Sequence, residues 1–205
     1  SADVELAERA ALLAKTDLMT EMVGEFGNLQ GIMGRYYALA DNEPKELALA
    51  LEEQYFPKQS GSPTASSTTG QILAIAEKID TLVGIFAVGL IPTGDKDPYA
   101  LRRATLGILR TIIENKLNIN IIELTEFADV QIKPIASHVG SGDKMYATGY
   151  VGNTPPVTSD RVIDFIFERL RGYCLDHGYT ADEFDAVIAV KPPEPLDFIQ
   201  RLKAV

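Results

Sequence analysis

The stretch Gly70–Gly89, GQILAIAEKIDTLVGIFAVG, decides the fold class of this 205-residue chain. Its apolar residues recur three, four, seven, ten, eleven and fourteen positions after the first, which places them on one face of an α-helix. The residues of this face are Ile72, Ile75, Ala76, Ile79, Leu82, Val83 and Phe86. The stretch therefore predicts one long buried helix, which the Gly- and Pro-containing turn at 91–94 ends.

Helical spacing of apolar residues predicts further helices on both sides of this stretch. They cover residues 4–25, 29–41, 44–55, 98–115, 159–177, 182–190 and 196–205. Asp97 and Pro98 give the clearest start signal, because Asp is a preferred N-cap residue and Pro a preferred first helical residue. The chain is thus predicted to be mainly α.

Residues 120–156 have a different character. Valines, isoleucines, glycines and prolines are scattered there without a helical period, which predicts an irregular or hairpin-containing connection. We expect a multi-helix domain over residues 1–120, the connection over 121–157, and a small helical region over 158–205.

Composition limits the classes of protein to consider. Hydrophobic residues make up 46% of the chain, but no apolar run reaches the roughly 18 residues of a membrane span. No charged-then-apolar leader is present, and a single cysteine, Cys174, leaves no disulfide framework or thiolate metal site within the chain. We expect a soluble cytoplasmic protein, and an internal fragment, because the chain lacks an initiator Met and its last predicted helix reaches the final residue.

No complete catalytic or metal site is visible in the sequence. The two histidines, His138 and His177, lie far apart, and no phosphate-binding loop or nucleophile motif occurs. Asp17, Glu21 and Glu25 share one helical face, which on an acidic protein is interpreted as a solvated face. The sequence therefore predicts no catalytic residue and no metal ligand.

Basic residues gather between residues 91 and 116, although the chain carries a net charge of −10. They are Lys96, Arg102, Arg103, Arg110 and Lys116. Their functional interpretation is a contact with RNA phosphates or with an acidic partner subunit, and Gly107 beside them would allow a close approach. The alternative is a set of salt bridges within the chain. Arg102 and Arg103 also lie near the positive end of their helix, where each needs a compensating negative partner.

Several long strings resemble the beta subunit of bacterial glycyl-tRNA synthetase. They are LLAKTDLMTEMVGEFGNLQGIMGRYYA (12–38), AEKIDTLVGIFAVGLIPTGDKDPYALRRATLGILR (76–110), FIFERLRGYCLDHGYTADEFDAVIA (165–189) and PLDFIQRLKAV (195–205). The resemblance implies an enzyme of alpha and beta subunits, in which the alpha subunit uses ATP and Mg to activate glycine and the beta subunit contributes to recognition of the glycine tRNA. The fragment would lack the N-terminal region and the C-terminal anticodon-binding domain, and would bind no cofactor, DNA or membrane itself.

The resemblance also implies an HD-like domain within residues 1–120. In HD phosphohydrolases a His-Asp pair and further His and Asp residues hold metal. The positions that match the pair here are Ala14 and Lys15, and a later Asp matches Glu77. Ala14 offers no ligand, and Lys15 adds a positive charge where a cation would bind, so the resemblance implies a degenerate metal site.

The main hypothesis is a non-catalytic module that supports tRNA recognition and assembly. Its candidate tRNA or subunit contacts are Lys96, Arg102, Arg103, Arg110, Lys15 and Arg35. One alternative is a module that docks the alpha subunit without RNA contact. Another is a surviving metal-dependent HD phosphohydrolase, which the missing His-Asp pair disfavours.

Overall fold

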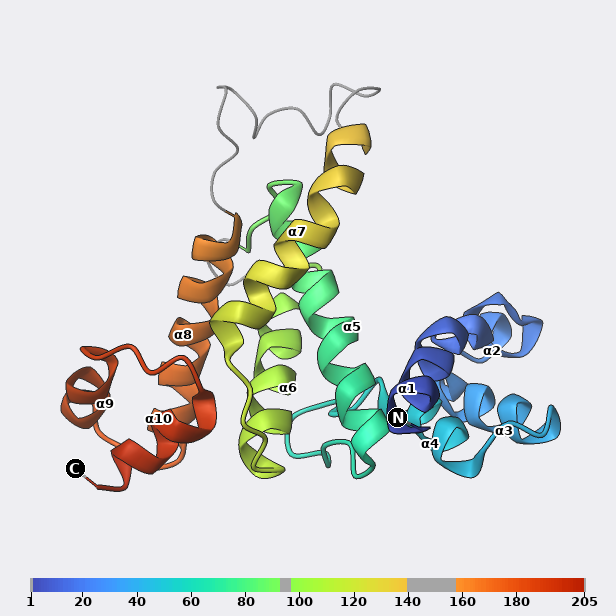
Figure 1. Ribbon diagram of the computed structural model, residues 1–205, viewed down its shortest axis with the longest axis horizontal. Helices are drawn as coiled ribbons and strands as arrows, with labels where there is room; N and C mark the ends of the chain where they lie inside the picture. Colours follow the sequence, from blue (N-terminus) through green and yellow to red (C-terminus); the bar gives the residue numbers. More distant parts are fainter. Residues whose placement is uncertain (1, 93–96, 140–157, 205) are drawn as a thin grey trace. The chain divides into compact units, whose positions relative to one another are not determined.

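The computed structural model describes residues 2–92, 97–139 and 158–204, and within these ranges it is helical with no strand (Figure 1). The α-helices are α1 Ala2–Leu13, α2 Glu21–Glu25, α3 Ile32–Ala40, α4 Lys45–Glu53, α5 Thr68–Ala87, α6 Leu101–Glu114, α7 Ile121–Val139, α8 Thr158–Asp176, α9 Ala181–Ile188 and α10 Pro195–Leu202. Two 3-10 turns, η1 Thr16–Met19 and η2 Gly27–Leu29, flank α2. The mainly α prediction is confirmed, and no helix in the described ranges is long and apolar enough to cross a membrane.

The chain divides into two compact units, Ser1–Glu77 and Lys78–Val205, called here the N-unit and the C-unit. The division falls inside α5, so the long apolar helix that the sequence predicted contributes residues to both cores. It does not coincide with the domain boundary expected at residue 120.

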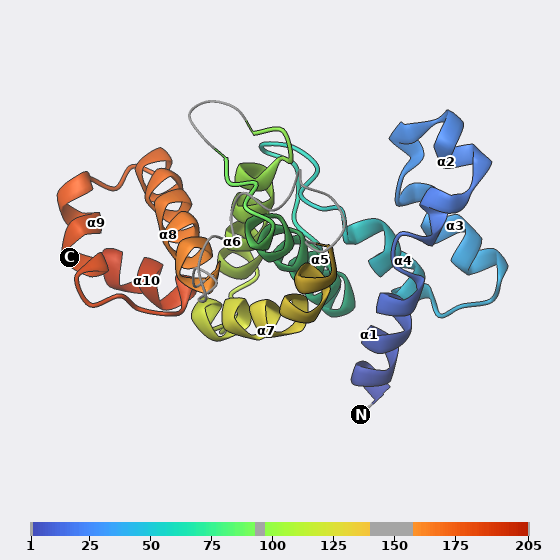
Figure 2. The same ribbon diagram turned by 90° about the horizontal axis from the view of Figure 1, so that it is seen from above.

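The N-unit is built around α4. Both α3 and α1 pack against α4, as Figure 2 shows, and the first residues of α5 complete the core. The buried residues of this core are Ala10, Ala38, Leu47, Ala48, Ala50, Leu51 and Leu73. The single helix predicted over residues 4–25 is wrong, because α1 ends at Leu13 and Lys15 adopts a left-handed φ of 61°. A left-handed residue cannot continue a right-handed helix.

A buried carboxylate fixes the start of α5. Glu53 at the end of α4 accepts hydrogen bonds from the backbone N–H of Ser66 at 2.8 Å and of Ser67 at 3.1 Å, and from both serine hydroxyls. Burial alone would raise the pKa of Glu53, but these four hydrogen bonds outweigh it and lower the pKa. Gly70 leaves room for this carboxylate, since a Cβ there would lie 2.1 Å from Glu53 Oε2.

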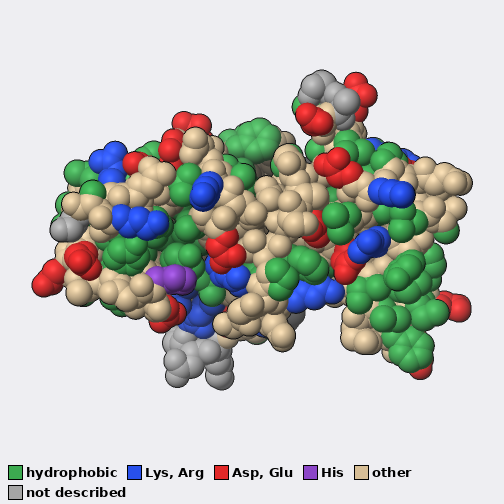
Figure 3. All heavy atoms as spheres, turned by 90° about the horizontal axis from the view of Figure 1, so that it is seen from below, with side chains coloured by type: hydrophobic (Ala, Val, Ile, Leu, Met, Phe, Trp, Pro, Cys, Tyr) green, Lys and Arg blue, Asp and Glu red, His purple; other side chains and the backbone are tan. Residues whose placement is uncertain are grey.

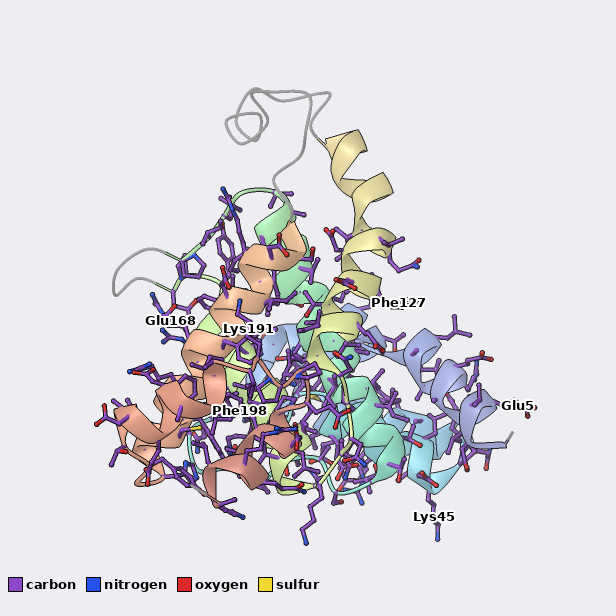
Figure 4. All side chains as sticks on the ribbon, turned by 60° about the vertical axis from the view of Figure 1, so that its left-hand side comes forward. Glu5, Lys45, Phe127, Glu168, Lys191 and Phe198 are labelled. Carbon is purple, nitrogen blue, oxygen red and sulfur yellow. The ribbon has the colours of Figure 1, made fainter. Side chains whose placement is uncertain are left out.

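The C-unit packs α6 against α8 and α10, α7 against α8, and α9 against α8 and α10. Phe198 of α10 is fully buried and packs against Phe184 of α9, with the rings tilted and their centroids 4.9 Å apart; Figure 4 labels Phe198 on α10. Phe86 of α5 meets Phe165 of α8 edge-to-face at 5.3 Å. Cys174 is fully buried beside this core, and burial raises the pKa of its thiol to about 12.

The predicted irregular connection is wrong over residues 121–139, which form α7. The side chain of Asn120 accepts hydrogen bonds from the N–H groups of Ile122 and Glu123, and its amide donates to the Glu123 carboxylate. This reciprocal pair is a strong helix start. Residues 140–157, for which a hairpin was the other expectation, lie outside the described residues.

Helix α6 begins at Leu101, three residues later than Asp97 and Pro98 predicted. Ala100 is left-handed, with φ of 57°, so the helix cannot include it. The Asp97 carboxylate nevertheless caps the helix from upstream, accepting hydrogen bonds from the N–H groups of Leu101 at 2.8 Å and Arg102 at 3.0 Å. A carboxylate at this place also interacts favourably with the positive end of the helix.

Candidate functional site

The break between α1 and η1 brings Lys15 and Glu77 together. The Lys15 ammonium lies 2.9 Å from Oε1 of Glu77 on α5, with both residues in the N-unit. The sequence resemblance matched these two residues to positions of an HD metal site, and in the structure they are neighbours. The Lys15 ammonium therefore lies beside the carboxylate at that position.

Asp17 lies on the same turn but does not belong to a solvated face. Its side chain is buried, and Oδ2 accepts a hydrogen bond of 2.6 Å from the Gly31 N–H. Gly34 lies against it, since a Cβ there would be 3.3 Å from the Asp17 carboxyl carbon. The interpretation of Asp17, Glu21 and Glu25 as one solvated stripe is wrong for Asp17, because the extended backbone at Thr20 separates η1 from α2 and no continuous helix aligns the three residues.

Tyr55 lies close to Asp17 and Glu77. Burial raises the pKa of Tyr55 to about 12, and the negative charges of Asp17 and Glu77 act in the same direction. Gly31 leaves room for the ring, since a Cβ there would lie 2.6 Å from a ring carbon of Tyr55. We call Lys15, Asp17, Tyr55 and Glu77 the polar cluster.

The polar cluster does not suit a bound metal. Ala14 offers no donor atom, the Lys15 ammonium repels a cation, and Asp17 is already bonded to the backbone. Among the described residues, no three His, Cys, Asp or Glu side chains converge as a metal site requires. The residues present therefore do not fit the ion that an HD domain holds. The place of Tyr55 and the burial of Asp17 were found only through the structure.

Three of the predicted basic contacts form ion pairs within the chain. Arg110 lies 2.6 Å from Glu114 one helical turn later, and Arg35 lies 3.1 Å from Glu52. Lys15 is the third, through Glu77. Gly107 is buried rather than facing outward, so the close approach predicted there is wrong. For Arg110, Arg35 and Lys15 the structure thus shows the alternative interpretation, ion pairs within the chain.

The other predicted basic contacts in the described residues, Arg102 and Arg103, lie in the first turn of α6. Arg103 is exposed and forms no hydrogen bond or ion pair with any described residue, whereas Arg102 is half-buried with its backbone N–H bonded to Asp97. Lys96 lies outside the described residues.

Sequence reasoning missed a second exposed arginine of the C-unit. Arg161 in the first turns of α8 is also exposed and without a partner among the described residues. Helices α6 and α8 pack together and run in the same direction, so Arg103 and Arg161 lie near the same end of the helix pair (Figure 1). A basic residue just after a predicted helix start was the available signal.

Comparison with known proteins decides the family. Residues 1–189 match the sequence profile described as "Glycyl-tRNA synthetase beta subunit". The chain belongs to this family. The glycine–tRNA ligase beta subunit of Pseudomonas savastanoi pv. phaseolicola is 48% identical over 203 residues, which cover 99% of this chain and 27% of that protein. That of Pseudomonas fluorescens is 49% identical over the same lengths.

Membership of the glycyl-tRNA synthetase beta subunit family confirms the resemblance stated from the sequence. The match also runs through residues 120–156, which the recognised strings did not cover. The chain spans about a quarter of the length of these relatives, 27%, so much of a family member's mass lies beyond the two units described.

Proposed function

We propose that this chain is a non-catalytic helical module of a glycyl-tRNA synthetase beta subunit. It supports tRNA recognition and assembly during the ATP-dependent attachment of glycine to tRNA. Its partners would be the alpha subunit, which would bind ATP and Mg, and the glycine tRNA, in the cytoplasm. Family membership supports the parent enzyme. The exposed, unpartnered Arg103 at the start of α6 is the observation that carries the RNA contact.

The polar cluster supports the non-catalytic part of the proposal. A phosphohydrolase of the HD type needs its ligands free to hold metal, whereas here one position is Ala14 and the next is a lysine paired with Glu77. In place of metal ligands, these positions hold an ion pair between Lys15 and Glu77 whose charges balance. The HD hydrolase alternative therefore has no supporting observation.

The distribution of ion pairs supports Arg103 and Arg161 as the RNA contacts. An arginine already paired with a carboxylate must lose that partner before it binds phosphate, whereas an exposed unpaired guanidinium does not. Arg110 and Arg35 are already paired with carboxylates. Arg103 and Arg161 are exposed and form no ion pair with the described residues.

The test uses the complete alpha/beta enzyme. We expect Arg103→Glu to raise KM for the glycine tRNA about fivefold, the equivalent of one lost phosphate contact of about 1 kcal/mol, with kcat unchanged. Arg161→Glu should act in the same direction, and both should flatten the salt dependence of tRNA binding.

Arg201→Glu is the matched control, because Arg201 is an exposed arginine of the C-unit that is already paired with Asp197. Equal KM values for Arg103→Glu and Arg201→Glu would remove the RNA contact. Loss of the alpha subunit from purified Arg103→Glu enzyme, with tRNA binding intact, would favour the docking alternative.

A further inference from the structure

Large exposed apolar side chains concentrate in one part of the N-unit. Of the 15 found on the described residues, eight lie between residues 12 and 39. They are Leu12, Leu18, Met19, Met22, Phe26, Tyr36, Tyr37 and Leu39, called here the apolar patch. Scattered apolar residues are normal on a protein surface, but a concentration of this kind marks a binding surface. Figure 3 shows the corresponding continuous green area over the region of α2.

The local structure explains why these side chains face outward. The short turns η1 and α2 direct Asp17 and Val23 into the core, and their neighbours Leu18 and Met22 then point away from it. Met19 is 89% exposed and Tyr36 is 62% exposed. Met and aromatic residues are enriched at the centres of protein interfaces.

An acidic pocket of about 490 Å³ opens among the same elements. Its lining includes Arg9, Asp17, Tyr37, Asp41 and Glu43, so one arginine faces three carboxylates. Arg9 is paired with Glu43, through a hydrogen bond of 3.1 Å from Nε. Asp41 is exposed and forms no ion pair with the described residues. The pocket therefore favours a cationic side chain and disfavours phosphate.

The pocket and the apolar patch share elements. Thr16, Asp17 and Thr20 line the pocket, while Leu18 and Met19 of the same turn belong to the patch. Tyr37 belongs to both. One ligand can thus cover both, with apolar side chains on the patch and a basic side chain in the pocket.

We propose that the apolar patch and the acidic pocket together dock a segment from the remainder of the beta subunit itself. This segment would present apolar side chains next to an Arg or Lys. This chain covers 27% of the length of its relatives, which are therefore almost four times as long. Most of the sequence of such a subunit lies outside these 205 residues and can supply the docking segment. A covalently connected segment reaches the surface at high effective concentration.

The test places a photo-crosslinking amino acid at Met19 of the full-length beta subunit in the alpha/beta complex. After irradiation, mass spectrometry identifies the attached peptide. We expect one that comes from the same beta chain, outside these 205 residues, and contains Arg or Lys. A mixture of isotope-labelled and unlabelled beta chains separates attachment within one chain from attachment between two. Ile72, which is 49% exposed in the same unit but outside the patch, is the control position.

A charge reversal adds a second measurement. Asp41→Lys should lower the yield of the Met19 cross-link about fivefold or more, because the pocket would then repel the basic side chain. Glu5 is an exposed carboxylate on α1 (Figure 4) that does not line the pocket, and Glu5→Lys should leave the yield unchanged. Attachment to the alpha subunit, to a second beta chain or to tRNA, or no attachment at all, would overturn the proposal. None of these outcomes depends on the KM values measured for Arg103.

Discussion

Lys15 and Asp17 stand two residues apart and stabilise the turn after α1 in different ways. Asp17 is buried, and its carboxylate satisfies a backbone N–H that has no helical partner. Lys15 remains partly exposed, and its ion pair with Glu77 is screened by solvent. The buried hydrogen bond between Gly31 and Asp17 is therefore expected to contribute more to stability than the Lys15–Glu77 ion pair.

Asp17→Ala should lower the free energy of unfolding by about 1–3 kcal/mol, because the Gly31 N–H would be left buried without an acceptor. Asp17→Asn keeps an acceptor oxygen and should cost clearly less. Urea denaturation of the two variants measures the difference. Equal costs would show that the bond to Gly31 contributes nothing.

Lys15→Ala and Lys15→Gly should differ although both remove the ion pair. The pair itself is worth about 0–1 kcal/mol at this exposure. Glycine, however, removes the cost of the left-handed φ of 61°, which is about 1 kcal/mol. Lys15→Gly is therefore expected to be the more stable variant by about 1 kcal/mol in thermal or urea unfolding. An order reversed in favour of alanine would contradict this.

Among the elements, α5 depends on a carboxylate that another helix supplies. The N–H groups and hydroxyls of Ser66 and Ser67 lie just before α5, and Glu53 at the end of α4 bonds all four. The connection between α4 and α5 is thereby fixed by charge-assisted hydrogen bonds. The stability of this connection should therefore depend on whether the Glu53 side chain is protonated.

Glu53→Gln should change how stability depends on pH. The pKa of Glu53 is lowered from its ordinary value of 4.5 in the folded chain. The stabilisation that follows is fully present above about pH 4.5 and is lost as the pH falls through the lowered pKa. At pH 7 we expect Glu53→Gln to cost about 1–3 kcal/mol, and below the lowered pKa the two proteins should converge. Urea titrations between pH 3 and 7 test this, with exposed Glu8→Gln as control.

Asn120→Ala should destabilise α7 by about 1 kcal/mol, the usual value of an N-cap side chain. Asn118→Ala, two residues earlier and exposed, should be neutral. Hydrogen exchange of the first turns of α7 measures the effect locally. Unchanged protection would show that the bond between Ile121 N–H and Pro193 C=O alone holds the helix end.

Local pattern predicted α5 and α8 because each carries a continuous apolar face. It failed for α7, where Pro134 and scattered β-branched residues hid the spacing of Ile121, Thr125, Ala128, Asp129 and Ile132, all of which are buried. The Asn120 and Glu123 cap was the available signal. The resemblance matched Lys15 and Glu77 to positions of one HD metal site but did not predict their ion pair, and the burial of Asp17 depends on Gly31, 14 residues away. Such a tertiary contact leaves no local pattern.

At the scale of the whole molecule, the two units have separate cores and should respond separately to damage. Leu47 in the N-unit and Phe198 in the C-unit are both fully buried. Leu47→Ala should cost about 2–5 kcal/mol and Phe198→Ala about 3–5 kcal/mol. In hydrogen exchange, each variant should lose protection mainly in its own unit. Equal loss in both units would show a single cooperative structure.

Cys174 gives the molecule a practical property. Thiol reagents need an accessible thiolate, and this sulfur is enclosed, with a pKa raised to about 12. The native chain should therefore resist maleimides and spin labels while it stays folded. A cysteine introduced at any exposed position would then be the preferred point of attachment for a dye or a paramagnetic probe, without removal of the natural one. Distances within these 205 residues thus become measurable with no other change to their sequence.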